Sequence, residues 1–342
     1  MRVAGPRHAW THYPDDRLLD VRFCDLGLRI EGTPVEAQVR RLHGELAALE
    51  MPLRPHCWIS LEWFSPDGVP GIALPFYLMH PRLMAMHWRF IGEVEGGNTR
   101  DLMRILRHEA GHAVDNAFRL RRHPAWRATF GRASQPYPDT YRPRPGSRRF
   151  VQHLGGWYAQ AHPTEDFAET FAVWLTPGSD WRARYRGWPA LAKLECVDRL
   201  MADLRGRRPP VRTRRVIEPV SAMRMTLGQY YSKLLRGERG PNAPALDRAL
   251  RRLFMTRDPS QRGSSAISLL RRATPYLKRR IALHLDVSDY LVGEVIAMVI
   301  GRCRALGLRV RGSRREALHR VERLIANQVG RTMRQYGPRL SL

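Results

Sequence analysis

Residues 102–116 read LMRILRHEAGHAVDN, and this stretch decides the fold of the region around it. Its apolar side chains recur every three or four residues, which predicts an amphipathic helix with one buried face. His108, Glu109 and His112 form the pattern HExxH on that helix. Residues four apart lie one turn apart on the same helix face, so both imidazoles can reach one zinc ion at roughly 2.0–2.1 Å. The sequence therefore predicts a metal site on this helix.

Glu109 follows the first of these histidines and is the predicted general base. From there its carboxylate can accept a proton from zinc-bound water and deliver it to a leaving amine. Three fixed letters are a weak signal alone, because two surface histidines on an ordinary helix give the same pattern. The apolar face around the motif favours the metal site. Gly111 also leaves room for another backbone to approach closely.

A third ligand is expected because a catalytic zinc usually has three protein ligands and one water. Residues 162–178 read HPTEDFAETFAVWLTPG, with Pro and Thr at a predicted helix start and Pro and Gly at its end. Glu165 and Glu169 share one face of this apolar helix, and Ala168 and Ala172 would permit close packing on the first helix. Buried acids require partners. We predict that Glu165 binds zinc and that Glu169 accepts a hydrogen bond from a ligating histidine.

The two stretches together resemble the gluzincins, which are zincin-fold peptidases with a glutamate ligand on a later helix and an acid four residues on. Residues 20–205 are similar to a bacterial family of zinc-binding metallopeptidases that shares ILRHEAGHAVDNA and HPTEDFAETFAVWL. This resemblance implies an α+β, zincin-like metallopeptidase domain, one Zn²⁺ per chain and a peptide or protein substrate. One departure is that the asparagine typical before a thermolysin-type glutamate ligand is absent.

Tyr158 precedes Glu165 by seven residues, an arrangement that also resembles the catalytic domain of lethal-factor-type peptidases. The resemblance implies that Tyr158 assists catalysis, and a neutral phenol can stabilise a tetrahedral oxyanion. A buried tyrosine with a satisfied hydroxyl would give the same sequence, and His153 and His162 are rival candidates for this role. Asp115, which lies near His112 by spacing, is either an orienting partner or a structural acid.

The remaining elements before residue 205 are less regular. Residues 21–30 and 58–64 are rich in β-formers, whereas residues 35–49 have apolar residues at helical spacing, which together predict strand, helix and strand. Residues 71–80 are expected to be extended. Pro75 would remove a ladder donor and so indicates an edge strand, to which a peptide substrate could add.

The formal net charge of +26 is unevenly distributed along the chain. Residues 1–205 hold 28 lysines and arginines against 23 acids, whereas residues 206–342 hold 30 against 9. The change coincides with RGRRPPVRTRR at residues 205–215, a stretch that cannot easily continue a helix. We therefore predict a peptidase domain over residues 1–205 and a basic domain over residues 206–342.

The basic domain is predicted to be all helical, and it shows no peptidase motif. Pro275 is expected to break or kink one of its helices. Phosphate contacts are the usual role of so much positive charge, so binding to nucleic acid or ribosomes is the alternative function. This function ranks below peptidase activity for two reasons. Few aromatic residues lie among the basic ones, and a solvated basic face that binds nothing would have the same composition. Apolar residues at helical spacing place the helices near residues 222–236, 244–256, 264–284, 287–306 and 313–335.

Composition favours a soluble protein that works in the cytoplasm, with no membrane partner. The first 16 residues lack the apolar core of a signal peptide, and residues 290–300 are too short to span a bilayer and contain Glu294. The four cysteines lie too far apart for any CxxC pair, which fits a reducing compartment. A protein that keeps zinc only for structure would need a fourth ligand, and none is evident.

Overall fold

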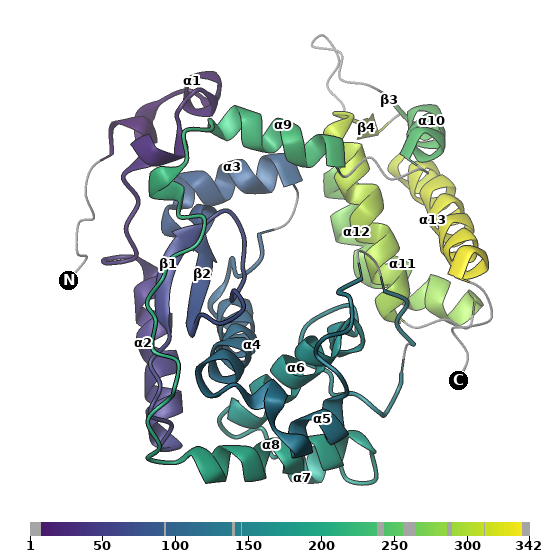
Figure 1. The fold of residues 1–342 in the computed structure, drawn as a ribbon. Coiled ribbons are helices and arrows are strands. Elements are labelled where there is room, and N and C mark those ends of the chain that lie inside the picture. The colour runs from purple at the N-terminus through teal and green to yellow at the C-terminus, as the bar shows by residue number, and fades with distance from the viewer. Residues whose placement is uncertain are drawn as a thin grey trace. The chain divides into compact units, whose positions relative to one another are not determined.

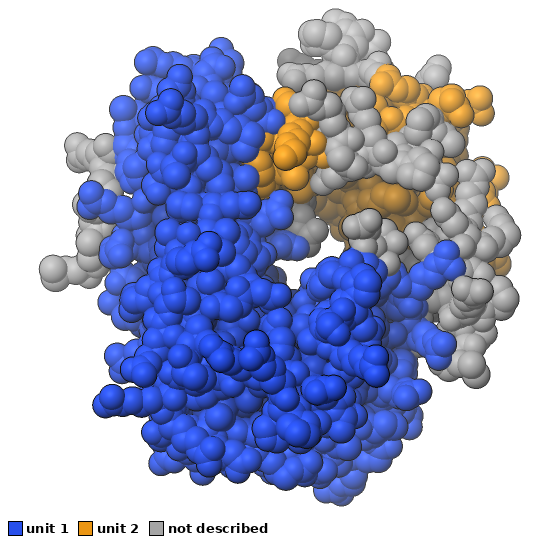
Figure 2. Space-filling view, viewed as in Figure 1, with its two compact units in different colours: residues 1–86, 94–229 blue, residues 87–93, 230–342 orange. Residues whose placement is uncertain are grey.

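The computed structural model describes residues 8–91, 94–138, 141–144, 146–237, 243–255, 264–285, 289–310 and 312–336. They form a helix-rich α+β fold with two small sheets (Figure 1). The chain divides into two compact units, one of residues 1–86 and 94–229 and one of residues 87–93 and 230–342 (Figure 2). The domain boundary expected at residue 205 remains a prediction. None of the described helices is both long and apolar enough to cross a membrane.

The first unit consists of helices around one parallel strand pair. Helices α3 (Pro81–Ile91) and α9 (Leu227–Gly237) each begin in this unit and end in the second. Its own α-helices are α1 (Asp15–Leu19), α2 (Pro34–Ala48), α4 (Thr99–Phe118), α5 (Pro124–Phe130), α6 (Pro163–Leu175), α7 (Trp181–Arg184) and α8 (Ala190–Leu204). Its 3-10 helices are η1 (Ala9–His12), η2 (Phe23–Leu26), η3 (Phe76–Met79), η4 (Leu120–Arg122), η5 (Tyr158–Gln160) and η6 (Val220–Ala222). The helix expected over residues 35–49 is therefore confirmed as α2.

Strands β1 (His56–Ser60) and β2 (Gly71–Pro75) pair in parallel, with His56 opposite Gly71 and Ser60 opposite Pro75. All five residues of β2 are buried, and the backbone N–H of Ala73 donates to the Phe64 carbonyl at 2.8 Å. The expectation of an extended segment up to residue 80 is wrong, because η3 follows directly after Pro75. This burial gives no support to an open edge strand, and we do not assign β2 to substrate binding.

The strand expected over residues 21–30 is also wrong. The segment forms η2, which ends at Gly27 in the left-handed region with φ of 59°. Phe23 and Leu26 are three residues apart, and a 3-10 helix places such residues on one side, where both are buried. Two backbone N–H groups of this segment donate to the carbonyls of Met223 and Met225. The backbone of this segment therefore bonds to a distant segment and does not form the strand that its β-formers suggested.

The arginine- and proline-rich segment after α8 is not helical, as predicted, and it lies along the first unit. The backbone N–H of Val211 donates to the Ala117 carbonyl at 3.1 Å. The Trp58 indole and the Ser60 hydroxyl of β1 donate to the carbonyls of Ile217 and Glu218 at 2.8 and 2.7 Å. These bonds satisfy backbone groups that have no helix or sheet partner of their own.

Helices α4 and α6 pack closely, and this contact positions the candidate site. A Cβ added to Gly111 would lie 2.9 Å from the Cα of Ala168, so only glycine allows this approach. The close packing expected from these two residues is confirmed. On the other side of α4, the buried Arg107 forms two hydrogen bonds of 2.7 Å with Glu45 of α2. Helix α4 is therefore fixed against both neighbouring helices.

The second unit contains α10 (Ala243–Leu253), α11 (Ala266–Leu285), α12 (Asp289–Ala305) and α13 (Arg314–Tyr336) around an apolar core. The helices predicted from spacing are confirmed to within a few residues, apart from the α9 start at Leu227. The all-helical prediction is wrong in one respect, because β3 (Phe254–Met255) and β4 (Arg309–Val310) form a short antiparallel pair. Pro275 lies inside α11 without ending it.

Candidate metal centre

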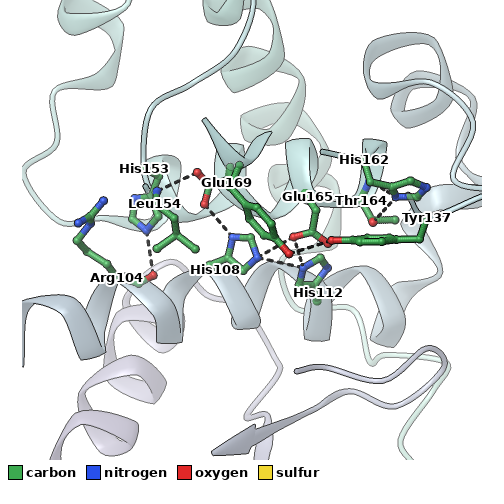
Figure 3. A network of polar contacts seen from close by, with 11 residues as sticks. Arg104, His108, His112, Tyr137, His153, Leu154, His162, Thr164, Glu165 and Glu169 are labelled. Atoms are coloured by element: carbon green, nitrogen blue, oxygen red, sulfur yellow. Dashed lines mark hydrogen bonds and ion pairs between the residues drawn. The ribbon is translucent and has the colours of Figure 1, made fainter. Parts of the chain in front are cut away.

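Three side-chain donors converge between α4 and α6 (Figure 3). The Nε2 atoms of His108 and His112 lie 3.0 and 3.2 Å from Oε2 of Glu165. The two Nε2 atoms are themselves 3.2 Å apart. The histidines lie one turn apart on α4, and Glu165 lies in the first turn of α6. The structure thus brings together the three residues predicted to bind zinc.

The three donor atoms fit a tetrahedral zinc ion. Four ligands at 2.0–2.1 Å from a metal are separated from one another by roughly 3.3 Å. The observed separations of 3.0 to 3.2 Å are close to that value. Two ring nitrogens that face each other can share only one proton, whereas a cation satisfies both lone pairs and the carboxylate. The chemistry of the donor set therefore fits the metal that the sequence indicates.

Glu169 lies behind His108, on the side of the ring away from the other donors. Its Oε1 is 2.9 Å from Nδ1 of His108, and its Oε2 accepts the backbone N–H of Leu154 at 2.9 Å. The carboxylate is almost fully buried, with 1% of the residue exposed. A proton held at Nδ1 by this carboxylate leaves the Nε2 lone pair directed at the donor cluster.

The charges of the cluster depend strongly on one another. Burial lowers the pKa of His108, but hydrogen bonds to Glu165 and Glu169 outweigh burial and raise it to about 10. For His112, burial is likewise outweighed by the Glu165 carboxylate, and the net pKa shift is upward. Burial raises the pKa of Glu165, yet the two imidazoles hold it well below its ordinary value. Glu165 is therefore a carboxylate at neutral pH, which is the form that binds a metal.

Glu109 is buried beside this cluster, and one of its oxygens is free. Its Oε2 has no hydrogen-bond partner in the described part of the chain. Burial raises the pKa of Glu109, and the nearby His108 and His112 oppose that rise. A buried carboxyl oxygen without a partner is costly and needs an explanation. A raised carboxyl pKa brings proton uptake and release closer to neutral pH, as general acid–base catalysis requires.

Tyr158 begins η5 and lies beside the cluster, with its ring centroid 5.6 Å from that of His108. Its hydroxyl lies 2.9 Å from the hydroxyl of Tyr137. Burial, followed by the charge of Glu165, raises the pKa of Tyr158. The same two causes, in the same order, contribute to raising the pKa of Tyr137 to about 12. Both side chains are therefore neutral phenols at physiological pH.

Tyr137 is the site residue that the sequence did not reveal. It lies in an irregular segment after α5, 28 positions before Glu165, so no helical spacing relates it to the motif. Its ring also lies 5.0 Å from that of His162. The only sequence signal would have been its place among prolines and serine in SQPYPDTY, which predicts a turn rather than a site.

His153 and His162, the alternative candidates for the role of Tyr158, both contact other groups. The Nε2 of His153 lies 2.9 Å from the Arg104 carbonyl, and burial lowers its pKa to about 4, so it is neutral. His162 is the N-cap of α6, where Nδ1 accepts the backbone N–H of Thr164 at 3.2 Å. Its Nε2 lies 3.1 Å from the Gln135 carbonyl. Each histidine thus has a structural role beside the cluster.

Asp115 is an ion-pair partner of Arg121. Its Oδ1 accepts the backbone N–H of Arg121 at 2.8 Å, and its Oδ2 accepts Nε at 2.7 Å. Burial raises the pKa of Asp115, and Arg121 opposes that rise. The guanidinium also contacts Asp67, which ties the end of α4 to the loop before β2. Of the two roles left open by the sequence, this geometry favours the structural one.

Residues 95–178 match the model of a family described as "Putative zinc-binding metallo-peptidase". The matched segment contains α4, α6, Tyr137 and Tyr158. The family resemblance is confirmed over this segment, which is shorter than the expected residues 20–205. The chain matches no curated protein and no solved structure.

Proposed function

We propose that this protein is a zinc-dependent peptidase in which His108, His112 and Glu165 hold one Zn²⁺ per chain. The observation that carries the proposal is the convergence of their three donor atoms at separations of 3.0 to 3.2 Å. The family match over residues 95–178 supports the same activity. When bound, zinc supplies Lewis-acid chemistry, because it polarises a peptide carbonyl and lowers the pKa of water.

A catalytic site is favoured over a structural one by the number of donors. Structural zinc sites normally have four protein ligands, whereas catalytic sites have three and an open position. The residues that the structure describes supply three donors to this cluster. A zinc ion held by these three residues would keep a position for water or for the substrate carbonyl.

Glu109 is the general base of the proposed mechanism. It takes a proton from the attacking water, whose oxygen forms the new bond to the carbonyl carbon. It then gives that proton to the amine nitrogen as the C–N bond breaks, so its charge is restored at the end of the cycle. The unpartnered Oε2 and the raised pKa of Glu109 support this role.

Tyr158 is proposed to donate a hydrogen bond to the carbonyl oxygen as negative charge develops on it. A neutral phenol is required for this, and the raised pKa of Tyr158 keeps the proton in place. Tyr137, whose hydroxyl is 2.9 Å away, holds the phenol of Tyr158 at the cluster. Because a donor aimed at an oxyanion acts mainly in the transition state, its removal should lower kcat more than it changes KM.

The test of the function is the variant Glu109→Gln. The zinc-loaded protein is incubated with a mixture of unstructured peptides, and new termini are identified by mass spectrometry. We expect cleavage to fall by roughly 10²–10⁴-fold while the zinc content stays that of the wild type. The matched control is Glu195→Gln, at an exposed position of α8, which should cleave normally. Unchanged cleavage by a zinc-loaded Glu109→Gln protein would show the mechanism to be wrong.

A further inference from the structure

Two arginines of the second unit lie against one exposed tryptophan. The Cζ atoms of Arg271 and Arg304 are 4.1 and 4.9 Å from the ring centroid of Trp88. Arg271 lies in the first half of α11, and Arg304 lies in the last turn of α12. Trp88 belongs to the part of α3 that packs with the second unit, and 38% of it is exposed. Three elements thus bring two guanidinium groups and an aromatic ring together.

These two arginines lack the acidic partners that others in the unit have. Arg302 pairs with Asp247, and Arg280 pairs with Glu322, each at 2.6 Å. Within the described ranges, neither Arg271 nor Arg304 forms an ion pair with an acid.

Arg304 also carries an unsatisfied donor, because its Nη1 is buried without a hydrogen-bond partner. Burial lowers the pKa of both arginines, and for Arg304 the charge of Arg271 lowers it further. Two positive charges that repel each other and a buried free donor are costly unless an anion binds between them. The trio of Arg271, Arg304 and Trp88 is therefore suited to an anionic group.

The surroundings of this trio indicate which anion. The adjoining face of α11 exposes Arg272, Tyr276 and Arg279, so one further aromatic ring lies between two arginines. Residues 230–342 hold 24 lysines and arginines against 8 acids, which favours a polyanion. Exposed rings among arginines are typical of single-strand binding, in which bases stack on the rings and phosphates contact the cations. A duplex keeps its bases stacked on one another and would leave the rings unused.

We propose that Arg271, Arg304 and Trp88 form a binding site for single-stranded nucleic acid, with a backbone phosphate held by the two guanidinium groups. An adjacent base stacks on the exposed part of Trp88, and the strand continues toward Tyr276. This site is independent of the zinc centre and gives the basic part of the chain a function of its own. It would bring the peptidase unit to proteins that are bound to a single strand.

The test compares two charge-conserving double variants of the full chain. A labelled single strand of about 12 nucleotides is titrated in a fluorescence anisotropy assay at about 50 mM salt. Arg271→Lys with Arg304→Lys keeps the net charge but removes the planar guanidinium groups, and we expect Kd to rise about fivefold or more. The control, Arg272→Lys with Arg279→Lys, changes two exposed arginines of the same helix. We expect it to alter Kd by less than about twofold.

Three results would overturn the proposal. Equal affinity of both double variants and the wild type would mean that binding depends only on net charge. Tighter binding of a duplex of the same length would contradict the choice of a single strand, and an absence of binding would remove the site altogether. If the first double variant unfolds, Arg271→Lys alone provides the test, because Arg271 is exposed. An abasic strand should bind the wild type more weakly, because it keeps the phosphates and lacks the stacking bases.

Discussion

The Nδ1 atom of His108 lies 2.9 Å from Oε1 of Glu169, on the side of the ring opposite the three converging donors. The two acids of α6 therefore contact the same imidazole at its two nitrogens, Glu165 at Nε2 and Glu169 at Nδ1. Four residues separate them, so one helical turn places the two acids in two different roles. The spacing of the EDFAE motif therefore places Glu165 among the converging donors and Glu169 behind the ring.

Glu169→Gln should weaken zinc binding without abolishing it. The amide oxygen can still accept from Nδ1 of His108, but the NH₂ group faces the backbone N–H of Leu154 and loses that hydrogen bond. Loss of such an orienting contact typically lowers metal affinity by about 10–100-fold. Competition with a chromogenic chelator measures the change, with Glu195→Gln as the exposed control. Wild-type affinity in Glu169→Gln would mean that Glu169 has no part in holding the ring.

Gly111→Ala should destabilise the protein. Its new methyl group would lie 2.9 Å from the Cα of Ala168, and the two helix backbones would have to separate. Overpacking of this kind costs about 1–3 kcal/mol. Gly44→Ala is the matched control, because its Cβ in α2 would meet nothing within 4 Å and should stabilise by about 0.5–1 kcal/mol. Denaturant unfolding of the three proteins separates these outcomes, and a Gly111→Ala protein as stable as Gly44→Ala would refute the close contact.

Tyr158→Phe should lower kcat by about 10²–10³-fold while KM and zinc content stay near their wild-type values. Tyr137→Phe should give a smaller loss of kcat, because it removes only the partner that holds the Tyr158 hydroxyl at 2.9 Å. Steady-state kinetics on one peptide substrate, with metal analysis of each variant, measures both effects. If Tyr137→Phe lost more activity than Tyr158→Phe, the two roles would have to be exchanged.

His87 should make stability depend on pH. It is buried 3.4 Å from the Tyr231 hydroxyl, and burial lowers its pKa from 6.5 to about 4. Between these values the unfolded chain binds a proton and the folded chain does not, so stability falls as the pH decreases from 6.5 to 4. The loss is at most about 3 kcal/mol. Thermal unfolding at pH 7 and pH 5 should show a smaller difference in His87→Gln than in the wild type, and identical differences would exclude this contribution.

Periodicity predicted the helices well because each buries an apolar stripe that the sequence displays. The convergence of His108, His112 and Glu165 could be predicted for a similar reason, since HExxH and the EDFAE helix fix relative positions within a few residues. The close contact between α4 and α6 could also be predicted, because Gly111 and Ala168 are small residues. Local spacing therefore determines most of the candidate site.

The failures have a common physical cause, which is pairing between distant segments. Residues 21–30 contain β-formers, yet they fold as η2 because their backbone bonds to Met223 and Met225. Tyr137 reaches the cluster through an irregular segment whose path no periodicity specifies. The short β3–β4 pair likewise joins residues that are 54 and 56 positions apart. Contacts of this range depend on the folded chain and leave no local pattern.

The most direct test of the metal centre is the zinc-to-protein ratio of the wild type beside Glu165→Ala, measured by elemental analysis after loosely bound metal has been removed. We expect about one zinc per wild-type chain and a ratio near zero in the variant, because two imidazoles without the carboxylate hold zinc weakly. A variant that retains as much zinc as the wild type, or a folded wild type that retains almost none, would contradict the three-ligand site of His108, His112 and Glu165.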